Sequence, residues 1–267
     1  MANAASTRTE ARKPGDSYVQ SFARGLEVIR SFSANAPSQT LTEVATRSGL
    51  TRAGARRILL TLVSLAYVTT DGKYFSLTPR ILDLGFAYLS SMPIWNLAEP
   101  VMQALVAEVR ESCSAAVLDD TDIVYVLRVP THKIMSISLG VGSRLPAYCT
   151  SMGRMLLSAL PEADMLQCLE KSDRHARTKH TVTEVTELAS RVAQARKQGW
   201  ALVNQELEEG LVSMAAPITN RSGQTVAALN ISGQANRTSA KAMQEAMLPQ
   251  LLAAAQNISR MLSVQRV

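Results

Sequence analysis

The sequence predicts an α+β protein built in two parts, and three observations lead to this prediction. Residues 40–75 carry two helix patterns that meet at a glycine and continue into a β-hairpin pattern. From residue 94 onward, helix patterns alternate with short strand patterns, which is typical of helices packed on an antiparallel sheet. The excess positive charge is confined to the first part, because residues 1–80 hold 11 Lys and Arg against 5 Asp and Glu.

Length and composition allow two domains and exclude several classes of protein. With 267 residues, 46% hydrophobic and 19% charged, the chain has the composition of a soluble globular protein. No apolar run approaches the ~20 residues of a membrane span, so no membrane partner is expected. Residues 1–17 lack the apolar core of a signal peptide. We therefore expect a disordered basic arm there, and a cytoplasmic protein.

The first helix pattern begins at Tyr18 and ends before the Asn35-Ala-Pro-Ser stretch. Its apolar residues recur at helical spacing and predict one buried face: Phe22, Leu26, Ile29 and Phe32. Arg24 lies off that face. We expect this helix to support the helix pair that follows.

Residues 40–66 predict a helix pair with a tight turn. Thr40 and Glu43 have the spacing of a capping box, in which each side chain satisfies a free backbone amide. Gly49 suits the turn because glycine adopts the left-handed conformation without steric cost. Thr51 can cap the second helix. The apolar stripe expected on that helix comprises Ala55, Ile58, Leu59, Leu62 and Ala66.

Three arginines lie off this stripe near the start of the second helix: Arg52, Arg56 and Arg57. A helix that enters the major groove of DNA brings its first residues near base edges, where Arg pairs with guanine or holds phosphates. Two alternating runs then flank Asp71-Gly72, a strong hairpin turn. The combination predicts a winged helix-turn-helix DNA-binding domain over residues 18–78. Its candidate DNA contacts are Arg24, Thr51, Arg52, Ala53, Arg56, Arg57 and Lys73.

Helix pairs with a glycine turn also occur in proteins that do not bind DNA, so the charge distribution is needed to decide. The whole chain holds 28 basic and 22 acidic residues, which leaves 17 of each sign in residues 81–267. The positive charge therefore belongs to the segment with the helix pair. Because neutralising phosphates supplies most of the non-specific affinity for DNA, this asymmetry favours a double-stranded DNA partner.

A further helix is predicted over residues 79–92, starting at Thr78-Pro79. Its broad apolar stripe comprises Ile81, Leu82, Leu84, Gly85, Tyr88 and Leu89. In one interpretation this linker helix pairs with a second copy, since half-sites on a duplex repeat about every 34 Å and favour two-fold pairing. In the other it packs against its own domain.

Residues 93–267 predict a second domain around an antiparallel sheet. The expected elements are a helix over 94–111, strands over 114–118, 123–129 and 134–139, helices over 151–160 and 162–170, a polar loop over 173–182, a helix over 183–198, strands over 200–203, 211–218 and 225–232, and a final helix over 239–263. The three cysteines are far apart and the three histidines lie in polar segments. We therefore expect no disulfide framework, metal site, cofactor or enzymatic activity.

Two later stretches resemble a known family. LPAYCTSMGRMLLSALP and GWALVNQELEEGLVSMAAPI, together with ALNIS and the helix pair, resemble the IclR family of bacterial transcriptional regulators over residues 18–265. The resemblance implies a winged helix-turn-helix domain, a GAF-like effector-binding domain over 93–267, and a homodimer or homotetramer on promoter DNA. It is strongest to the branch that controls aromatic-acid catabolism in response to protocatechuate, hydroxybenzoate or related β-ketoadipate pathway acids. A small organic acid effector is therefore implied.

A small anion is bound well by the amides at a helix start together with hydroxyl and amide side chains in an apolar cup. The sequence offers a helix start at 151–153 and polar residues on two strands, at positions that match the family's pocket. The candidate effector contacts are Leu139, Tyr148, Ser151, Met152, Gly153, Ser213, Asn230 and Ser232.

The chain departs from the family pattern after its Gly-Trp-Ala turn. Many relatives carry an acidic pair there, whereas Val203-Asn204-Gln205 precede Glu206 here, so the first carboxylate of that pair is absent. Arg128 and Arg144 are each a candidate partner for an effector carboxylate or an ordinary surface arginine. An alternative function is a DNA-binding protein whose degenerate pocket leaves regulation to protein partners.

Overall fold

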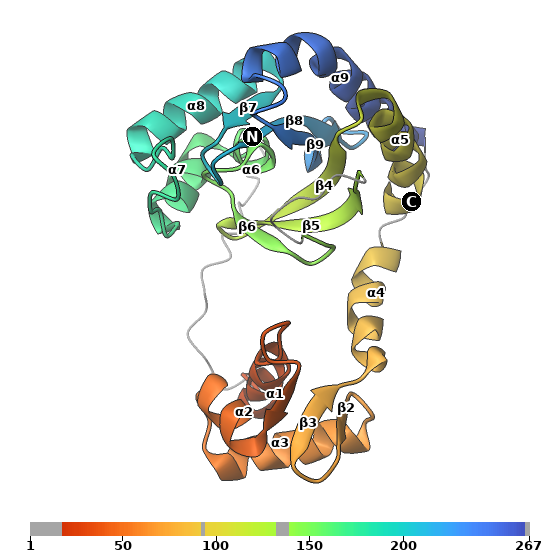
Figure 1. Ribbon diagram of the computed structural model, residues 1–267, viewed down its shortest axis with the longest axis vertical. Coiled ribbons are helices and arrows are strands. Elements are labelled where there is room, and N and C mark those ends of the chain that lie inside the picture. Colours follow the sequence, from red (N-terminus) through yellow and green to blue (C-terminus); the bar gives the residue numbers. More distant parts are fainter. Residues whose placement is uncertain (1–17, 92–93, 132–138, 265–267) are drawn as a thin grey trace, which may run out of the picture. The chain divides into compact units, whose positions relative to one another are not determined.

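The chain divides into two compact units, Met1–Tyr88 and Leu89–Val267 (Figure 1). This computed structural model describes residues 18–91, 94–131 and 139–264, so the arm predicted over 1–17 lies outside the described residues. The boundary between the units falls inside the helix that we predicted as a linker over 79–92. It lies a few residues before the predicted domain boundary at residue 93.

The first unit begins with three helices and a small sheet. The helices are α1 (Gln20–Arg30), α2 (Leu41–Arg47) and α3 (Arg52–Ser64). The strands β1 (Ser38–Thr40), β2 (Val68–Thr70) and β3 (Tyr74–Leu77) pair in the antiparallel order β1-β3-β2. The hairpin of β2 and β3 is the predicted wing. Strand β1 is not in the prediction, because three residues that run directly into a helix cap carry no alternating pattern of their own.

The local signals of the helix pair are confirmed. The Glu43 carboxylate accepts the Thr40 backbone N–H at 2.7 Å, and the Thr40 side chain accepts the Glu43 N–H, which completes the capping box. These hydrogen bonds from Thr40, the backbone one first, hold the pKa of Glu43 below its usual value. Gly49 turns the chain with a φ of 66°, and the Thr51 side chain caps α3 through the Gly54 N–H.

The apolar face predicted for the first helix is only partly buried. Phe22 is 68% exposed and Leu26 is 42% exposed, whereas Val28, which lay outside the predicted stripe, is fully buried. Only the C-terminal half of α1 reaches the core of the unit. The residues of that core are Val28, Phe32, Val44, Ala45, Ala55, Leu59, Leu62, Val68 and Phe75.

The end of α3 corrects a second detail of the prediction. We placed Ala66 on the buried stripe of this helix, but α3 ends at Ser64 and Ala66 is exposed with a φ of 62°. The Tyr67 N–H donates to the Leu62 carbonyl at 2.9 Å, so the chain turns out of the helix and into β2.

The predicted linker helix begins with a single 3-10 turn, η1 (Pro79–Ile81), capped by Thr78, and continues as α4 (Leu82–Ser90). No residue of α4 is buried, and its large apolar side chains are among the most exposed of the first unit. They are Leu82 at 69%, Leu84 at 51%, Phe86 at 69% and Tyr88 at 47%. Packing against the described part of its own domain therefore does not cover the stripe.

The second unit contains a six-stranded antiparallel sheet in the order β6-β5-β4-β9-β8-β7. Its strands are β4 (Ser112–Asp119), β5 (Asp122–Val129), β6 (Arg144–Pro146), β7 (Ala201–Asn204), β8 (Leu211–Thr219) and β9 (Thr225–Gln234). Of the strand predicted over 134–139, residues 134–138 lie outside the described residues and Leu139 is in no strand. Strand β6 is not in the prediction, because its three residues are too few to alternate.

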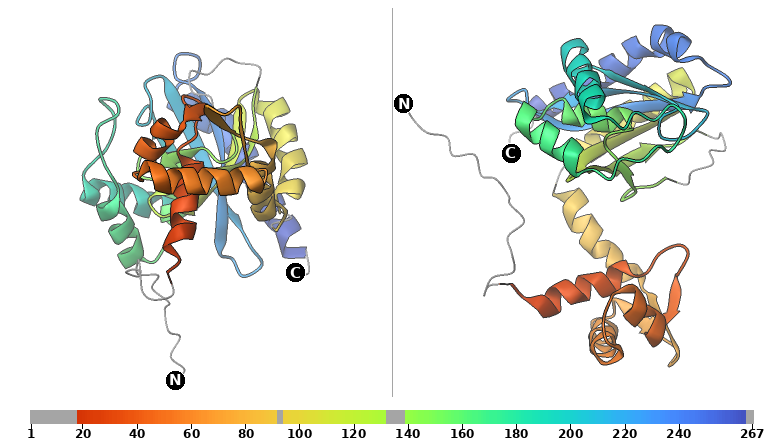
Figure 2. Two further views of the ribbon diagram at one scale, coloured as in Figure 1. Left: turned by 90° about the horizontal axis from the view of Figure 1, so that it is seen from below. Right: turned by 90° about the vertical axis from the view of Figure 1, so that its left-hand side faces the viewer.

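Helices cover both faces of this sheet (Figures 1 and 2). On one face α5 (Ile94–Val109) and α9 (Ala240–Val264) pack on a core that includes Leu229 and Ile231. On the other, α6 (Ser151–Leu157), α7 (Glu162–Lys171) and α8 (Val185–Gln198) enclose a second core. Strand side chains alternate between faces, so Asn230 and Ser232 of β9 point toward the α6 side. None of the helices in the described residues is long and apolar enough to cross a membrane.

Candidate functional site

The three arginines of α3 all lie on the surface. Arg52 and Arg56 are four residues apart, so they share one side of the helix, and Arg57 follows a quarter turn further round. All three are exposed, and none forms an ion pair within the described part of the chain. They are therefore available to an external anion. Thr51 and Ala53 are also exposed at the start of the helix.

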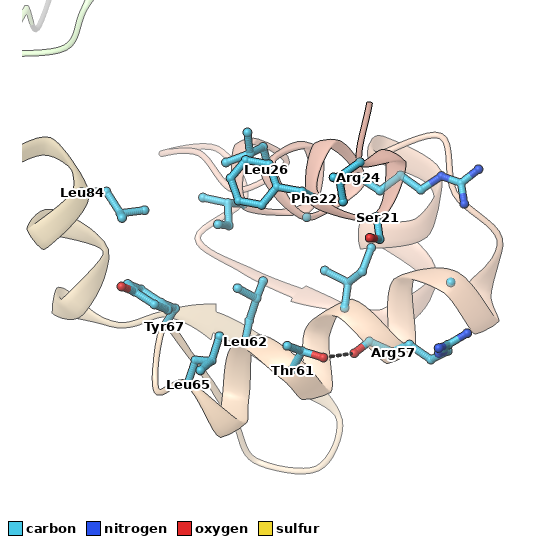
Figure 3. A pocket seen from close by; sticks show the side chains of 15 residues that line it. Ser21, Phe22, Arg24, Leu26, Arg57, Thr61, Leu62, Leu65, Tyr67 and Leu84 are labelled. Atoms are coloured by element: carbon cyan, nitrogen blue, oxygen red, sulfur yellow. Dashed lines mark hydrogen bonds between the residues drawn. The ribbon is translucent and has the colours of Figure 1, made fainter. Parts of the chain in front are cut away.

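A groove of about 790 Å³ runs between α1 and α3 (Figure 3). Arg24 of α1 and Arg57 of α3 lie at the same end of it, whereas its other end is lined by apolar side chains, among them Leu26, Leu65 and Leu84 (Figure 3). The arrangement separates the basic residues into two groups. Arg52 and Arg56 form one, and Arg24 with Arg57 forms the other.

The wing presents one cation at its tip. The Asp71 carboxylate accepts the backbone N–H groups of Lys73 and Tyr74 at 2.9 and 2.7 Å, and Gly72 takes a φ of 96°. The Lys73 ammonium lies 5.1 Å from the centre of the Tyr74 ring, within the range of a cation–π contact. The turn chemistry thus fixes the tip from which Lys73 projects.

In the second unit, six of the predicted effector residues line one cavity between the sheet and the start of α6. They are Leu139, Ser151, Met152, Ser213, Asn230 and Ser232. Seven further residues of the described part of the chain also line it: Tyr125, Arg128, Cys149, Thr150, Val203, Leu207 and Leu211.

The other two predicted residues do not line the cavity. Tyr148 is fully buried, and its hydroxyl donates to the His175 carbonyl at 2.9 Å, so the side chain braces a neighbouring loop. A Cβ on Gly153 would lie 2.1 Å from the Ala147 carbonyl oxygen, and the Gly153 N–H is held by the Thr150 hydroxyl at 3.2 Å. Glycine is therefore required there by close packing of α6.

The sheet side of the cavity carries a connected set of polar groups. The Asn230 amide oxygen accepts the Ser114 backbone N–H at 3.0 Å, and its NH₂ donates to the Ser232 hydroxyl at 2.9 Å. Arg128 donates to the Ser114 hydroxyl at 3.3 Å. Because a serine hydroxyl both accepts and donates, Ser232 can pass a hydrogen bond on to a bound group.

A β-bulge directs Arg128 toward this cavity. Ala115 pairs with Leu127 but Ala116 pairs with Tyr125, so Val126 is an extra residue in β5. Side chains normally alternate along a strand, which would put Tyr125 and Arg128 on opposite faces. With the extra residue between them, both line the same cavity. Arg144, the other candidate, instead pairs with Asp119 at 2.6 Å and Asp122 at 3.2 Å on the surface.

Ser151 supplies a polar group without a partner. It is 1% exposed, and among the described residues no group lies within hydrogen-bond distance of its hydroxyl. Burying a hydroxyl without a hydrogen bond costs about 1–3 kcal/mol, so such a group is expected to serve a purpose. A polar ligand in this cavity would satisfy it.

Two titratable groups on the cavity wall stay neutral at physiological pH. Burial raises the pKa of Tyr125 to about 12, so its phenol remains a hydrogen-bond donor. Burial raises the pKa of the Cys149 thiol to about 11, with a smaller opposing effect from the Arg177 charge. A thiol in this state is a poor nucleophile. Among the described residues there is also no cluster of His, Cys, Asp and Glu that could hold a metal ion.

The cavity is closely filled by its own walls. It encloses about 20 Å³, which is room for about one water molecule. Pockets that hold small ligands generally enclose about 300–1,000 Å³. Its walls must therefore separate before an organic ligand can enter.

Both units match described protein families. Residues 21–72 match the IclR helix-turn-helix domain, and residues 86–260 match the C-terminal domain of the bacterial transcriptional regulator IclR. The second match alone covers more than half of the chain.

Individual proteins match over nearly the whole length. A Pca regulon regulatory protein of Pseudomonas putida is 41% identical over 92% of this chain and 84% of that protein. A p-hydroxybenzoate hydroxylase transcriptional activator of Acinetobacter baylyi is 34% identical over 88% of this chain and 89% of that protein. A solved structure of an IclR homologue from Microbacterium hydrocarbonoxydans, complexed with 4-hydroxybenzoate, superposes with a TM-score of 0.80 at 25% identity, covering 91% and 99% of the two chains.

Proposed function

Since the chain belongs to the IclR family of bacterial transcriptional regulators, we propose that a small aromatic carboxylic acid in its second unit controls how its first unit acts on promoter DNA. The protein is a DNA-binding regulator and not an enzyme. The aromatic acid is suggested by relatives named for p-hydroxybenzoate metabolism and by the homologue complexed with 4-hydroxybenzoate.

The unpartnered hydroxyl of Ser151 is the observation that carries this proposal. It lines the same cavity as Arg128, Ser213, Asn230 and Ser232. Five apolar side chains also line it: Leu139, Met152, Val203, Leu207 and Leu211. A carboxylate is best met by a guanidinium and hydroxyl donors, and an aromatic ring by apolar side chains. The lining therefore offers polar partners for the carboxylate of an aromatic acid and apolar side chains for its ring. Arg128 is our candidate for the carboxylate partner.

For DNA, the exposure of the α3 arginines supports a division of roles. Arg52 and Arg56 lie on one side of the helix near its start, and we assign them to base edges in the major groove, with Thr51 and Ala53 beside them. We assign Arg24 and Arg57, at one end of the groove between α1 and α3, to backbone phosphates. Lys73 at the wing tip is assigned to a phosphate as well.

The exposed apolar side chains of α4 and α1 support assembly of at least two copies. Exposed contiguous apolar surface of this kind usually marks an interface. A second copy is the partner that a two-fold operator requires, since two readers must reach successive half-sites about 34 Å apart. We accordingly propose a homodimer, or a homotetramer built from two such dimers. Because promoter DNA is its target, we place the protein in the bacterial cytoplasm.

The closely filled cavity favours a second candidate function, in which the pocket is degenerate and protein partners regulate the DNA-binding unit. A melting-temperature screen separates the two. A ligand that binds only the folded protein stabilises it by about 2.7 kcal/mol when present at 100 times its Kd. We expect 4-hydroxybenzoate or protocatechuate to raise the melting temperature, and pyruvate, which has a carboxylate without a ring, to have no effect.

The Ser151→Ala variant serves as the matched control, because it removes one hydroxyl from the cavity and adds no bulk. Its response to the same acids should be weaker than that of the natural protein. If no aromatic acid changes the melting temperature while operator DNA still binds, the degenerate-pocket function is the correct one.

A further inference from the structure

The proposed effector cavity has three walls. The first is the sheet, whose strands β5, β8 and β9 are held by antiparallel hydrogen-bond ladders. The second is the start of α6, with Ser151 and Met152. The third is the connection from β7 to β8, which contributes Leu207 and Leu211.

A buried ion pair joins the start of α6 to the connection from β7 to β8. Arg154 of α6 donates from Nη1 to Oε1 of Glu206 at 2.8 Å and from Nη2 to Oε2 at 2.5 Å. Arg154 is 3% exposed and Glu206 is 8% exposed. The remaining guanidinium position, Nε, donates to the Tyr148 carbonyl at 3.3 Å. Two parallel hydrogen bonds fix both the distance and the orientation of the groups that they join.

Each member of the ion pair is close in sequence to a residue that lines the cavity. Arg154 is three residues after Ser151, so it lies about one helical turn from that cavity residue on the same side of α6. Glu206 directly precedes Leu207. The ion pair therefore links the α6 wall to the β7–β8 wall close to Ser151 and Leu207.

A second loop holds the Glu206 side of the pair. The Thr178 hydroxyl donates to the Gln205 carbonyl at 2.7 Å, and the Thr181 hydroxyl donates to the Glu206 carbonyl at 2.6 Å. The Val182 N–H donates to the Glu206 carboxylate at 3.3 Å. The predicted polar loop over 173–182 thus contributes three hydrogen bonds to Gln205 and Glu206, one of them to the carboxylate of the ion pair.

The connection from β7 to β8 is also closed on itself. Its ends take left-handed conformations, with φ of 61° at Gln205 and 83° at Gly210. The Gln205 side chain accepts the Gly210 N–H at 2.9 Å, and the Gln205 N–H donates to the Leu211 carbonyl at 2.7 Å. These hydrogen bonds tie the two ends of the segment together, so a link at Glu206 also restrains the adjacent Leu207.

We propose that Arg154 and Glu206 are positioning residues that limit how far the cavity opens and so set which acids fit. This inference rests on the proposed function. A buried ion pair is weak evidence for added stability, because well-packed apolar residues of similar volume often replace one without loss. A role in positioning explains why the pair lies between α6 and the connection from β7 to β8 and not elsewhere in the core.

The test measures selectivity rather than affinity alone. Titration calorimetry gives the Kd of 4-hydroxybenzoate and of a two-ring hydroxynaphthoate for the natural protein and for the double variant Arg154→Met with Glu206→Leu. The double variant leaves no unpaired buried charge, although the Tyr148 carbonyl and the Val182 N–H each lose a hydrogen bond, so its melting temperature is measured first to establish that it folds. We divide the Kd of the hydroxynaphthoate by the Kd of 4-hydroxybenzoate. This ratio should be about tenfold or more lower in the double variant than in the natural protein, which is within the range of discrimination that pocket fit provides.

Two further variants keep the test decisive. Glu209→Gln removes a charge from the same loop at an exposed position and should leave the ratio unchanged. Glu206→Asp keeps the charge but shortens the side chain that carries it, so it should also change the ratio of the two Kd values. This variant replaces the double variant in the test if the double variant does not fold. An unchanged ratio in a folded double variant, or in Glu206→Asp, overturns the proposal. If the natural protein binds neither acid, the proposed function fails instead.

Discussion

The two units use arginine in opposite ways. In the first unit Arg52 and Arg56 are exposed and have no ion-pair partner in the described residues. In the second, Arg154 is 3% exposed and forms two hydrogen bonds with Glu206. An exposed guanidinium is available to an external polyanion, whereas a buried one fixes geometry inside the protein. The positive charge excess of residues 1–80 therefore indicates exposed arginines that can bind a polyanion. A buried, paired arginine such as Arg154 leaves no such excess, because its charge is balanced by Glu206.

The largest effect that would sharpen this comparison is expected from the first unit. The double variant Arg52→Ala with Arg56→Ala should weaken promoter binding by about 100-fold, since a lost base contact costs about 1–3 kcal/mol. Binding of 4-hydroxybenzoate should not change. Fluorescence anisotropy with labelled promoter DNA measures the first quantity and calorimetry the second.

Arg221→Ala is the control for that experiment, because it removes an equally exposed arginine from the turn between β8 and β9. It should leave promoter affinity within about twofold, as surface substitutions away from a binding site generally do. Because Arg221→Ala removes one charge and the double variant two, a free-energy loss in Arg221→Ala about half that of the double variant would mean that net charge, rather than the position of the arginines on α3, determines DNA binding.

The next effect concerns Arg128 in the second unit. Arg128→Ala should reduce the affinity for 4-hydroxybenzoate by roughly 10- to 150-fold, since a hydrogen bond to a charged group contributes about 1.5–3 kcal/mol. Arg144→Ala should have no such effect, because Arg144 pairs with Asp119 and Asp122 on the surface. Calorimetric titration of both variants distinguishes them. Equal affinities in the two would remove Arg128 from the carboxylate site.

A smaller effect is expected at Ser151. Ser151→Ala should lower acid affinity by about 2- to 13-fold, corresponding to about 0.5–1.5 kcal/mol for a neutral hydrogen bond. The melting temperature of the free protein should stay the same or rise, because the hydroxyl that is lost had no partner.

Ser158→Ala, one residue after the end of α6, provides the contrasting variant. Ser158 is also buried, but its hydroxyl donates to the Met155 carbonyl at 2.7 Å. Its loss should lower the melting temperature and leave acid affinity unchanged. The account of Ser151 would be contradicted if the two variants behaved alike.

The smallest effect is a pH dependence of the first unit. The folded-state pKa of Glu43 is lowered from 4.5 by the hydrogen bonds from Thr40, so its contribution to stability is complete above pH 4.5. That contribution is lost as the pH falls through the folded-state pKa. The difference in melting temperature between the natural protein and Glu43→Gln should therefore shrink on acidification. A difference that stays constant would show that the capping carboxylate does not act through its charge.

The fold was largely predictable because its signals are local. The capping box of Thr40 and Glu43, the turn at Gly49 and the hairpin at Asp71-Gly72 each depend on residues within a few positions of one another. The same holds for the end of α8 at Gly199, where φ is 79°. Such features can therefore be predicted without knowledge of how the rest of the chain packs.

The effector cavity was only partly predictable because it depends on contacts distant in sequence. The family resemblance pointed to Asn230 and Ser232, whereas the extra residue at Val126 reverses the alternation in β5 and turns Arg128 toward the cavity. Nothing local to Arg128 marks that bulge. The pairing of Arg154 with Glu206 spans 52 positions and has no sequence signal of its own.

The central claim is that the two units are coupled, so that acid in the second changes DNA binding by the first. The most direct test is the Kd for promoter DNA with and without saturating 4-hydroxybenzoate. Coupling free energies of about 1–3 kcal/mol predict a change of roughly 5- to 150-fold in either direction. Identical Kd values, with calorimetry showing that the acid is bound, would contradict the account.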